Sequence, residues 1–475
     1  MLFTSITYLF FLPLVVIGYF LLKPKWRWAW LLIASYAFYM SWKPIYALLI
    51  LSSTVLDYYC AIGMAKKREK KDRKPFLYIS LLGNLGMLFL FKYLGFFNEL
   101  IRDISELFSL DYGVSTLSIL FPIGISFYTF QSLSYTIDVY RGDREPERHF
   151  GIMALYVSFF PQLVIGPIEK STVLLPQLRI VQKFQWFNVT EGLRLITWGV
   201  FKKIVLADKI GHYVNTVYDN PHDYHGFSYV IIGFAFTLQV LFDFGGYTDI
   251  AIGSAKLFGI DLSINFKQPF HAKNIREFWG RWHMSMTQWF YEYLFKPISR
   301  KFRKGWRLNI LILMLVIGFW HGPSWGFLIF GLIHGIYYIV SEELPVFENK
   351  NNRFLDTLLK GIAMCGVFIL VSISTYFFRA ETIGDAIYAF TEGVKGFVSF
   401  NYSVEELGIH RADAIIICLN LFVYFIIQNL PNHNPKNPFS SIRYRWIRWG
   451  IYYYLLLMIF SLAHTKMQEF IYFHL

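Results

Sequence analysis

Two histidines lie within one basic-to-apolar stretch of this sequence, residues 276–335. His283 lies in REFWGRWHMSMTQWF, and His321 lies in the apolar run GFWHGPSWG. An imidazole with an unperturbed pKa of about 6.5 can take up and return a proton at neutral pH. A polar side chain in apolar, membrane-type sequence is costly unless it is paired or faces a wet cavity. His321 is therefore a candidate general base, and the alternative is a structural histidine bonded within a broken helix.

A third histidine, His334, lies 13 residues beyond His321 in an apolar run. We interpret it as a packed histidine. The three histidines are 38 and 13 residues apart, and the sequence contains no HExxH motif and no close pairing of histidine with cysteine. Zinc sites are recognised by such short spacings. The sequence therefore does not predict a metal site.

Two carboxylates lie in a second unusual stretch, FDFGGYTD. Asp243 and Asp249 fall within an apolar run, and Gly245 and Gly246 stand between them. Acids in such a position can orient a histidine or line a cavity. The alternative is that they cap a helix break at the two glycines. The sequence leaves both interpretations open.

The composition places these residues in a membrane protein. Of the 475 residues, 55% are hydrophobic, 20% are aromatic and only 16% are charged, whereas soluble domains have about a quarter of their residues charged. Apolar runs recur along the whole length, which predicts an all-α, polytopic membrane protein with a single domain, residues 1–475. The net charge is +13, and the positive residues lie in short loops. That pattern favours the cytoplasmic bias of Lys and Arg over nucleic-acid binding.

Charged loops predict the direction of the crossings. The basic run KKREKKDRK at 66–74 should be cytoplasmic, which puts the amino terminus outside. From the other end, the basic loop 436–448 should also be cytoplasmic. The last transmembrane helix and its tail, 447–475, then lead outward to FIYFHL. About 10–12 transmembrane helices are expected in all.

The middle of the chain predicts irregular helices. Apolar runs between 150 and 265 are interrupted by FPQLVIGPIEK, by FKKIVLADK and by FDFGGYTDIAIG. Prolines and glycines in these interruptions break or bend helices. Irregular backbone at membrane depth must be buried in protein or line a cavity. We therefore expect a cavity in this region.

The segment 265–307 ends in a strongly basic run, so we place it on the cytoplasmic side. Five of its aromatic residues suit an interfacial helix, namely Trp279, Trp282, Trp289, Phe290 and Tyr291. The loop 341–358 is also placed inside, so the apolar segment 308–340 must enter and return. Its first half is shorter than the roughly 30 Å hydrocarbon core. This predicts a re-entrant hairpin with His321 at or near its tip.

Several stretches together resemble the membrane-bound O-acyltransferase (MBOAT) family, in its bacterial alginate O-acetylase branch. They run in order over essentially the whole chain: LFKYLGFF (90–97), ISFYTFQSLSYTIDVYRG (125–142), FFPQLVIGPI (159–168), LFDFGGYTDIAIG (241–253), EFWGRWHMSMTQWFYEYLFKPI (277–298), GFWHGPSWGFLIFGLIHG (318–335), FFRA (377–380) and the terminal FIYFHL (470–475). Gly280 departs from the bulkier, often basic residue expected in FWxRWH, which bears on local packing.

The resemblance implies a helical bundle around a central funnel or tunnel, with a catalytic core over 120–345. It implies transfer of an acyl group to a hydroxyl of a cell-surface polymer, in concert with an extracytoplasmic, SGNH-type acyltransferase partner. The expected activity is acetylation of an alginate-like exopolysaccharide or of peptidoglycan from a cytoplasmic donor, acetyl-coenzyme A, at the bacterial plasma (inner) membrane. No permanently bound cofactor is expected.

The resemblance also implies roles for particular residues. Acyl transfer from a thioester needs a base and a means of stabilising the oxyanion. His321 matches the base, and His283 matches a second histidine that orients the donor or helps proton transfer. The alternative for His283 is an interfacial residue satisfied by water. Arg281 and Lys296 are candidates for contacting the phosphates of the donor, with snorkelling to lipid headgroups as the alternative.

Tyr472, in the terminal FIYFHL, is the third candidate catalytic residue. A phenol with a pKa of about 10 is a better leaving group than an aliphatic alcohol. An acetyl ester on this phenol would remain ready for transfer to an outside partner. The alternative is that the tail is an aromatic anchor at the membrane interface.

Three rival functions are considered. D-alanyl transfer to teichoic acid would need a carrier-protein donor, and that system carries the tail motif on a separate peptide. A transporter of an acyl donor or glycan, and a subunit that only recruits the partner, would both tolerate His321→Ala. An enzyme would not.

Overall fold

The computed structural model describes residues 1–114, 122–344, 352–399, 407–463 and 470–471. Every regular element within these ranges is a helix, which confirms the predicted all-α class. Six of these helices are long and apolar enough to cross a membrane. They are Pro44–Ala65, Lys70–Leu107, Phe227–Leu257, Trp325–Glu343, Arg353–Arg379 and Arg411–Gln428. Two shorter apolar helices, Ile6–Leu21 and Trp306–His321, accompany them.

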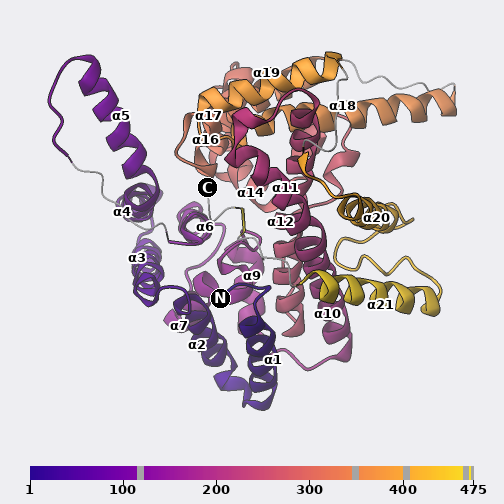
Figure 1. Ribbon diagram of the computed structural model, residues 1–475. Coiled ribbons are helices and arrows are strands. Elements are labelled where there is room, and N and C mark those ends of the chain that lie inside the picture. The colour runs from indigo at the N-terminus through magenta and orange to yellow at the C-terminus, as the bar shows by residue number, and fades with distance from the viewer. Residues whose placement is uncertain (115–121, 345–351, 400–406, 464–469, 472–475) are drawn as a thin grey trace. The chain divides into compact units, whose positions relative to one another are not determined.

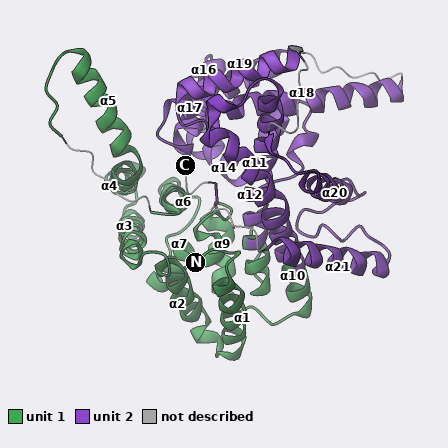
Figure 2. Ribbon diagram, viewed as in Figure 1, with its two compact units in different colours: residues 1–192, 251–263 green, residues 193–250, 264–475 purple. Residues whose placement is uncertain are grey.

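The helices fall into two compact units, which Figure 2 colours separately. Unit 1 comprises residues 1–192 and 251–263. Its helices, labelled in Figure 1, are α1 (Ile6–Leu21), α2 (Arg27–Met40), α3 (Ala47–Ala65), α4 (Lys70–Leu88), α5 (Leu94–Leu107), α6 (Ile125–Arg141), α7 (Phe150–Ser158), α8 (Phe160–Leu163) and α9 (Ser171–Arg179).

A buried carboxylate joins α3 to α4 within unit 1. Asp57 is fully buried, and it accepts hydrogen bonds from Ser80 Oγ at 2.5 Å and from Asn84 Nδ2 at 2.9 Å. A buried acid is tolerated when donors of this kind surround it. These hydrogen bonds therefore fix the position of α3 relative to α4.

Unit 2 comprises residues 193–250 and 264–475 and contains the stretch with the three histidines. Two helices, α10 (Trp186–Val200) and α12 (Phe227–Leu257), run across the sequence boundaries of the units. The others are α11 (Asp208–Asp219), α13 (Ile275–Trp279), α14 (Met284–Phe290), α15 (Lys296–Lys301), α16 (Trp306–His321), α17 (Trp325–Glu343), α18 (Arg353–Arg379), α19 (Ile383–Ser399), α20 (Arg411–Gln428) and α21 (Arg445–Leu462).

The irregular middle of the chain was predicted correctly at one place and wrongly at another. In FFPQLVIGPIEK, α7 ends at Ser158, α8 is a single turn, and α9 begins only at Ser171. In contrast, α12 continues through Gly245 and Gly246 without a break. A Cβ at Gly246 would lie 2.8 Å from the carbonyl oxygen of Gly199. The glycine therefore lets two helices approach closely and does not interrupt one.

The stretch FKKIVLADK is likewise helical, because a π-helical segment, Phe201–Ala207, joins α10 to α11. We call residues 186–219, which these three elements form, the π-bulged rod. A π-segment inserts an extra residue per turn and is frequent at functional sites. Here it carries two neighbouring lysines, Lys202 and Lys203, both buried.

The predicted hairpin at 308–340 is confirmed as a pair of closely packed helices, α16 and α17, while its re-entrance into the membrane stays a prediction. The turn lies at Gly322–Ser324, and His321 is the last residue of α16. A Cβ at Gly318 would lie 2.2 Å from the carbonyl oxygen of Phe327, and one at Gly331 would lie 2.4 Å from that of Met314. These glycines allow the two backbones to touch.

The expectation of one interfacial helix over 265–307 was wrong. The segment is divided into the short helices α13, α14 and α15 with a π-helical segment, Tyr291–Phe295, before α15. Trp279 and Phe290 are only 3% and 2% exposed, so they pack in the interior of the protein. The sequence pattern of aromatic and basic residues was read as an amphipathic surface, whereas folding brings part of it inside.

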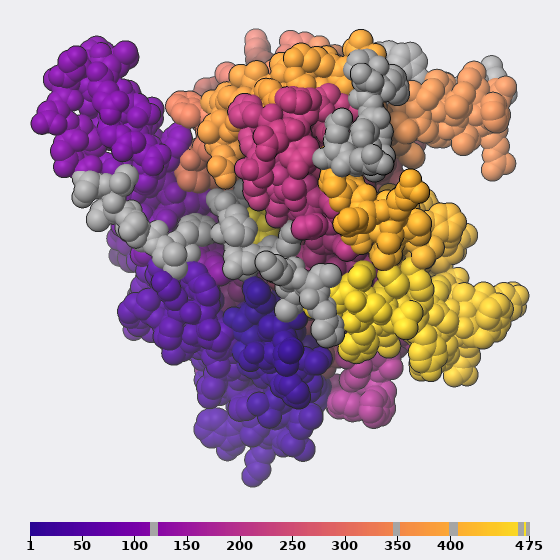
Figure 3. Space-filling model, viewed as in Figure 1, coloured from indigo at the N-terminus to yellow at the C-terminus, as the bar shows by residue number. Residues whose placement is uncertain are grey.

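The last helices of unit 2 carry apolar side chains on their surface. Figure 3 shows the outer surface of α20 and α21, coloured towards yellow. Exposed apolar residues on them include Ile415, Phe422, Trp446, Tyr453 and Phe460. Exposed apolar surface of this extent suits contact with lipid.

Candidate active site

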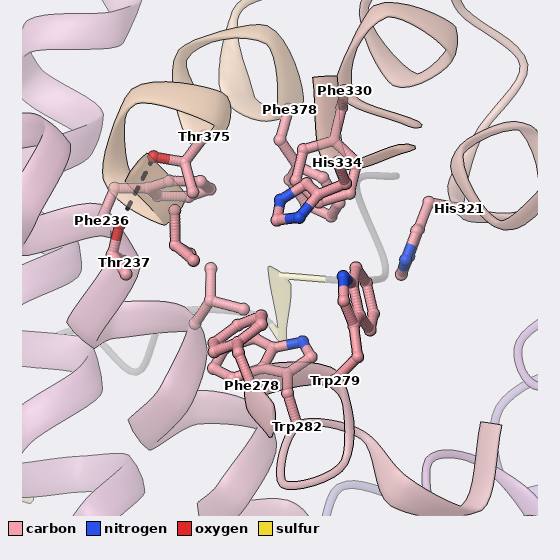
Figure 4. A pocket seen from close by; sticks show the side chains of 12 residues that line it. Phe236, Thr237, Phe278, Trp279, Trp282, His321, Phe330, His334, Thr375 and Phe378 are labelled. Carbon is pink, nitrogen blue, oxygen red and sulfur yellow. Dashed lines mark hydrogen bonds between the residues drawn. The ribbon is translucent and has the colours of Figure 1, made fainter. Parts of the chain in front are cut away.

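A pocket inside unit 2 brings His321 and His334 to one place (Figure 4). The space open to the centres of water molecules is about 30 Å³. This is enough for about two waters or a group of similar size. The lining comes from α12, α13, α16, α17 and α18 and from the turn after α13. It consists of Phe236, Thr237, Val240, Phe278, Trp279, Trp282, His321, Phe330, His334, Val371, Thr375 and Phe378.

His321 is held at the pocket wall by the end of its helix and by aromatic packing. The side chain is 3% exposed, and its ring centroid lies 5.2 Å from that of Phe378 and 6.1 Å from that of Phe330. A Cβ at the next residue, Gly322, would lie 2.2 Å from the ring of Phe327. The histidine–glycine pair therefore ends α16 at a point where only glycine allows the close approach.

His334 faces the same pocket from α17. It is 1% exposed, and its Nε2 lies 2.9 Å from Ser374 Oγ. Its ring centroid lies 5.2 Å from the indole of Trp279, at an interplanar angle of 77°. Figure 4 shows the two rings on facing sides of the pocket, with His321 beside them. His334 is packed, as predicted, but it is also part of the pocket wall, which the sequence interpretation missed.

His283 is fully buried. The interpretation of His283 as an interfacial residue satisfied by water is therefore wrong. The residue has a left-handed backbone conformation, with φ of 44°, immediately before α14. Asn265 holds this turn: its carbonyl oxygen accepts from Met284 N at 2.9 Å and its Oδ1 accepts from Ser285 Oγ at 2.6 Å. Burial lowers the pKa of His283 to about 3, so the imidazole is neutral at pH 7.

One tryptophan connects the two predicted catalytic histidines. The ring centroid of Trp320 lies 6.0 Å from that of His283 and 5.1 Å from that of His321. The two imidazoles thus belong to a single aromatic cluster without contacting the same pocket, since His283 does not line it.

The two predicted phosphate-contacting residues lie apart from the pocket lining. Arg281 is paired with Glu277 at 2.7 Å. Burial raises the pKa of the Glu277 carboxyl, but the hydrogen bond from Lys273 N and the ion pair with Arg281 outweigh this effect, so the pKa lies below its ordinary value. Lys296 is exposed, and its Nζ lies 5.1 Å above the ring of Tyr291. Both charges reach the surface, but Arg281 is only partly exposed and is paired with a carboxylate.

Asp243 and Asp249 pair with lysines of the π-bulged rod and do not cap a helix break, because α12 continues past Gly245 and Gly246. Neither acid lines the pocket beside His321. Lys202 Nζ lies 2.6 Å from Asp249 Oδ2. Lys203 Nζ lies 2.8 Å from both Asp243 Oδ1 and Asp208 Oδ1. The sequence offered a partial signal, since Lys202 and Lys203 in one apolar stretch and Asp243 and Asp249 in another carry opposite charges.

The carboxyl-terminal tail enters the interior of unit 2. Phe470 is fully buried, with its ring centroid 4.6 Å from that of Tyr247 and 5.9 Å from that of Phe244. Ile471 N donates to Asp243 Oδ2 at 3.0 Å. Tyr472 itself lies outside the described residues. Phe244 also contacts His283, with centroids 4.6 Å apart, so the tail ends its described course one aromatic ring away from His283.

The described residues contain no group of three or more His, Cys, Asp or Glu side chains that could hold a metal ion. Aromatic rings separate the three histidines, and the residues that line the pocket with His321 and His334 are apolar or carry an indole or a hydroxyl group. The arrangement can support proton transfer and burial of a small acyl group.

Comparison with known proteins decides the family. The membrane-bound O-acyltransferase family matches residues 149–377. The peptidoglycan O-acetyltransferase of Helicobacter pylori is 31% identical over 82% of this chain and 78% of its own. The probable alginate O-acetylase of Pseudomonas aeruginosa is 34% identical over 81% of this chain and 73% of its own.

The chain belongs to the membrane-bound O-acyltransferase family. It is an O-acyltransferase and a multi-pass membrane protein, as predicted. The teichoic acid D-alanyltransferase of Bacillus subtilis is also similar, but it is 27% identical over only 49% of this chain and 61% of its own. The wider similarity is therefore to the O-acetyltransferases.

Proposed function

We propose that this acyltransferase passes acetyl groups from acetyl-coenzyme A on the cytoplasmic side to an extracytoplasmic polysaccharide, an alginate-like exopolysaccharide or peptidoglycan. The observation that carries the proposal is the position of His321 on the wall of a buried, largely apolar pocket. The O-acetyltransferases named above are similar over about four fifths of the chain, which favours acetyl over D-alanyl transfer.

In the proposed reaction His321 acts as the general base. The imidazole takes the proton of an acceptor hydroxyl, whose oxygen forms a bond to the carbonyl carbon of the thioester. The bond from that carbon to sulfur breaks, and the proton passes to the departing thiolate. A buried neutral imidazole is suited to this role because it can bind the proton and return it.

His283 and the carboxyl-terminal tail lie on the side of Trp320 that is away from His321, and we assign each of them a role in the transfer. We assign His283 to orienting the acyl donor or assisting proton transfer. The hydroxyl of Tyr472 takes the acetyl group as a phenyl ester and presents it to an SGNH-type partner outside the plasma membrane. Supporting this role, the two residues that precede Tyr472 lie against Asp243, Phe244 and Tyr247, close to His283.

Arg281 and Lys296 are assigned to the phosphates of coenzyme A, and Lys296 is the stronger candidate because its charge is not paired with Glu277. Membrane lipid surrounds the helices, and the reaction needs no permanently bound cofactor.

The proposal is tested by measuring acetyl esters on the surface polymers of cells that produce the wild type, His321→Ala or Tyr472→Phe. His410→Ala, at an exposed position, is the control. We expect loss of acetyl esters in the first two variants and normal levels in the control, at equal amounts of protein in the membrane. Normal acetylation in His321→Ala would contradict the base assignment and would favour a transporter or a recruiting subunit. Normal acetylation in Tyr472→Phe would contradict only the carrier role of the tail.

A further inference from the structure

The pocket beside His321 contains two buried polar atoms to which the described residues offer no hydrogen-bond partner. One is Nε1 of Trp279 and the other is Nδ1 of His334. Both side chains are almost fully buried, at 3% and 1% exposed, and both line the pocket. Buried polar groups are normally satisfied, so two exceptions facing one cavity indicate a ligand.

The proton positions on these two rings follow from their neighbours. An indole Nε1 always carries a hydrogen and can only donate. Ser374 has a single hydroxyl hydrogen, which it donates to the carbonyl oxygen of Val371 at 2.6 Å. Its oxygen must therefore accept from His334 Nε2–H, at 2.9 Å. The neutral imidazole then has no proton on Nδ1, which faces the pocket as an acceptor.

The hydroxyl groups among the described lining residues do not donate into the pocket, because their hydrogens are bonded to backbone carbonyl oxygens. Thr237 Oγ1 donates to the carbonyl oxygen of Gly233 at 2.9 Å, and Thr375 Oγ1 donates to that of Ser372 at 2.7 Å. Val240 and Val371 and several phenylalanines complete the wall. Trp282 also lines the pocket with an indole N–H. The pocket therefore has an apolar part and a polar part, in which indole donors and one acceptor, Nδ1 of His334, stand near His321.

An acetyl group matches only half of this polar pair. Its carbonyl oxygen accepts from Trp279 Nε1–H, where negative charge also develops during acyl transfer. Its methyl group offers no hydrogen to His334 Nδ1, so that acceptor would be buried without a partner. An acyl group with a hydroxyl on its α-carbon supplies both an acceptor and a donor within a few ångströms.

We propose that the pocket also accepts α-hydroxyacyl groups, the two-carbon glycolyl group above all, with the carbonyl oxygen bound by Trp279 and the α-hydroxyl donating to His334. The proposal rests on the acyl transfer at His321 described above. The bonds that form and break are the same, because only the substituent on the acyl group changes. An α-ammonium would also donate, but no carboxylate lines the pocket to compensate its charge.

The experiment compares two acyl groups of equal shape. Propionyl and glycolyl differ by a methyl group in place of a hydroxyl, and a purely apolar pocket distinguishes such isosteres weakly, by at most about a hundredfold in favour of the methyl group. Full-length protein in lipid vesicles is supplied with the acetyl, propionyl or glycolyl thioester of N-acetylcysteamine and with p-cresol as the hydroxyl acceptor. The initial rate of thiol release gives kcat/KM for each thioester.

For the wild type we expect kcat/KM for the glycolyl thioester to exceed that for the propionyl thioester by about tenfold or more. One neutral hydrogen bond contributes a difference of this size. His334→Phe should bring the ratio to one or below, whereas His334→Gln, whose amide oxygen accepts, should keep part of the preference. Tyr337→Phe is the control, since Tyr337 contacts the His334 ring from outside the pocket lining and its change should leave the ratio unaltered.

The outcomes separate this inference from the function on which it rests. A wild-type ratio of one or less, with acetyl turnover intact, would overturn the inference and leave acetyl transfer standing. A ratio that survives His334→Phe would equally overturn it. The glycyl thioester of N-acetylcysteamine, supplied in the same assay, replaces the α-hydroxyl by an α-ammonium, and its faster turnover than the glycolyl thioester would refute the assignment to a neutral donor. Absence of turnover with the acetyl thioester would instead refute the proposed function.

Discussion

Two buried polar regions of unit 2 differ in how completely their groups are paired. Where α12 packs against the π-bulged rod, each lysine ammonium has a carboxylate within 2.8 Å. In the pocket beside His321, the side chains are neutral and two ring nitrogens have no partner among the described residues. Paired buried charges hold elements in place, whereas unpaired buried polar atoms are available to a substrate. We therefore assign a structural role to the first region and propose that the second is the site of chemistry.

The largest expected effect comes from removing the cation of the structural region. Lys203→Met leaves Asp208 and Asp243 buried without their shared ammonium, and loss of one partner from a buried ion pair costs about 3–5 kcal/mol. We expect a marked fall in the thermal unfolding temperature. Lys202→Met, which removes the partner of Asp249 alone, should cost less. Equal stability of the Lys203 variant and the wild type would show that the region does not hold the fold.

The next effect concerns the donor in the pocket. Trp279→Phe keeps an aromatic ring but removes the N–H, and loss of one oxyanion donor typically lowers kcat by about 10²–10³-fold. The unfolding temperature should fall only by the cost of the lost packing around the smaller ring, since no hydrogen bond within the described residues is lost. A change in KM alone, with kcat preserved, would limit Trp279 to binding the ground state.

A smaller effect should follow from weakening the contact between Asp243 and the tail. Asp243→Asn replaces a charge-assisted hydrogen bond to Ile471 N by a neutral one, which is about half as strong. We expect polymer acetylation to fall about fivefold to tenfold and carboxypeptidase to shorten the tail faster. Asp208→Asn is the matched control, because Asp208 pairs with the same lysine through a separate contact. Identical behaviour of the two variants would refute a specific role in holding the tail.

The smallest effect is the pH dependence of stability from His283. Burial lowers the pKa of this residue to about 3, compared with about 6.5 in an unfolded chain. The unfolded state therefore binds more protons than the folded state. The contribution of neutral His283 to the free energy of unfolding is fully present above pH 6.5 and is lost as the pH falls towards 3. Between these limits the slope approaches about 1.4 kcal/mol per pH unit. Thermal unfolding from pH 7 to pH 5 should show a shallower dependence in His283→Asn than in the wild type.

Sequence patterns predicted the all-helical class, the hairpin at 308–340 and the proximity of His321 to a cavity, because hydrophobic length and charge distribution carry that information. They did not predict the continuous helix through Gly245 and Gly246, since a glycine that breaks a helix and one that lets helices touch are identical in sequence. The partners of Asp243 and Asp249 were missed for a related reason: the pairing spans some forty residues and depends on how two helices cross.

The site was predictable only in part. His321 was found by its apolar context and His283 by its match to the family's stretches, but Trp279 was assigned to a membrane interface because tryptophan is common there. Its burial depends on the division of 265–307 into short helices, which no periodicity indicated. The role of His334 depends on the hydroxyl of Ser374, forty residues further along the chain, so the free acceptor is visible only in the folded protein.

The central claim is that His321 performs the proton transfer, and single-turnover kinetics test it most directly. Full-length wild type, His321→Ala and His410→Ala are mixed with acetyl-coenzyme A in lipid vesicles, with p-cresol as acceptor, and thiol release is followed over the first turnover. We expect a loss of about a hundredfold or more in the rate of the first turnover in His321→Ala across the neutral pH range, with His410→Ala unchanged. A first turnover in His321→Ala at the wild-type rate would contradict it.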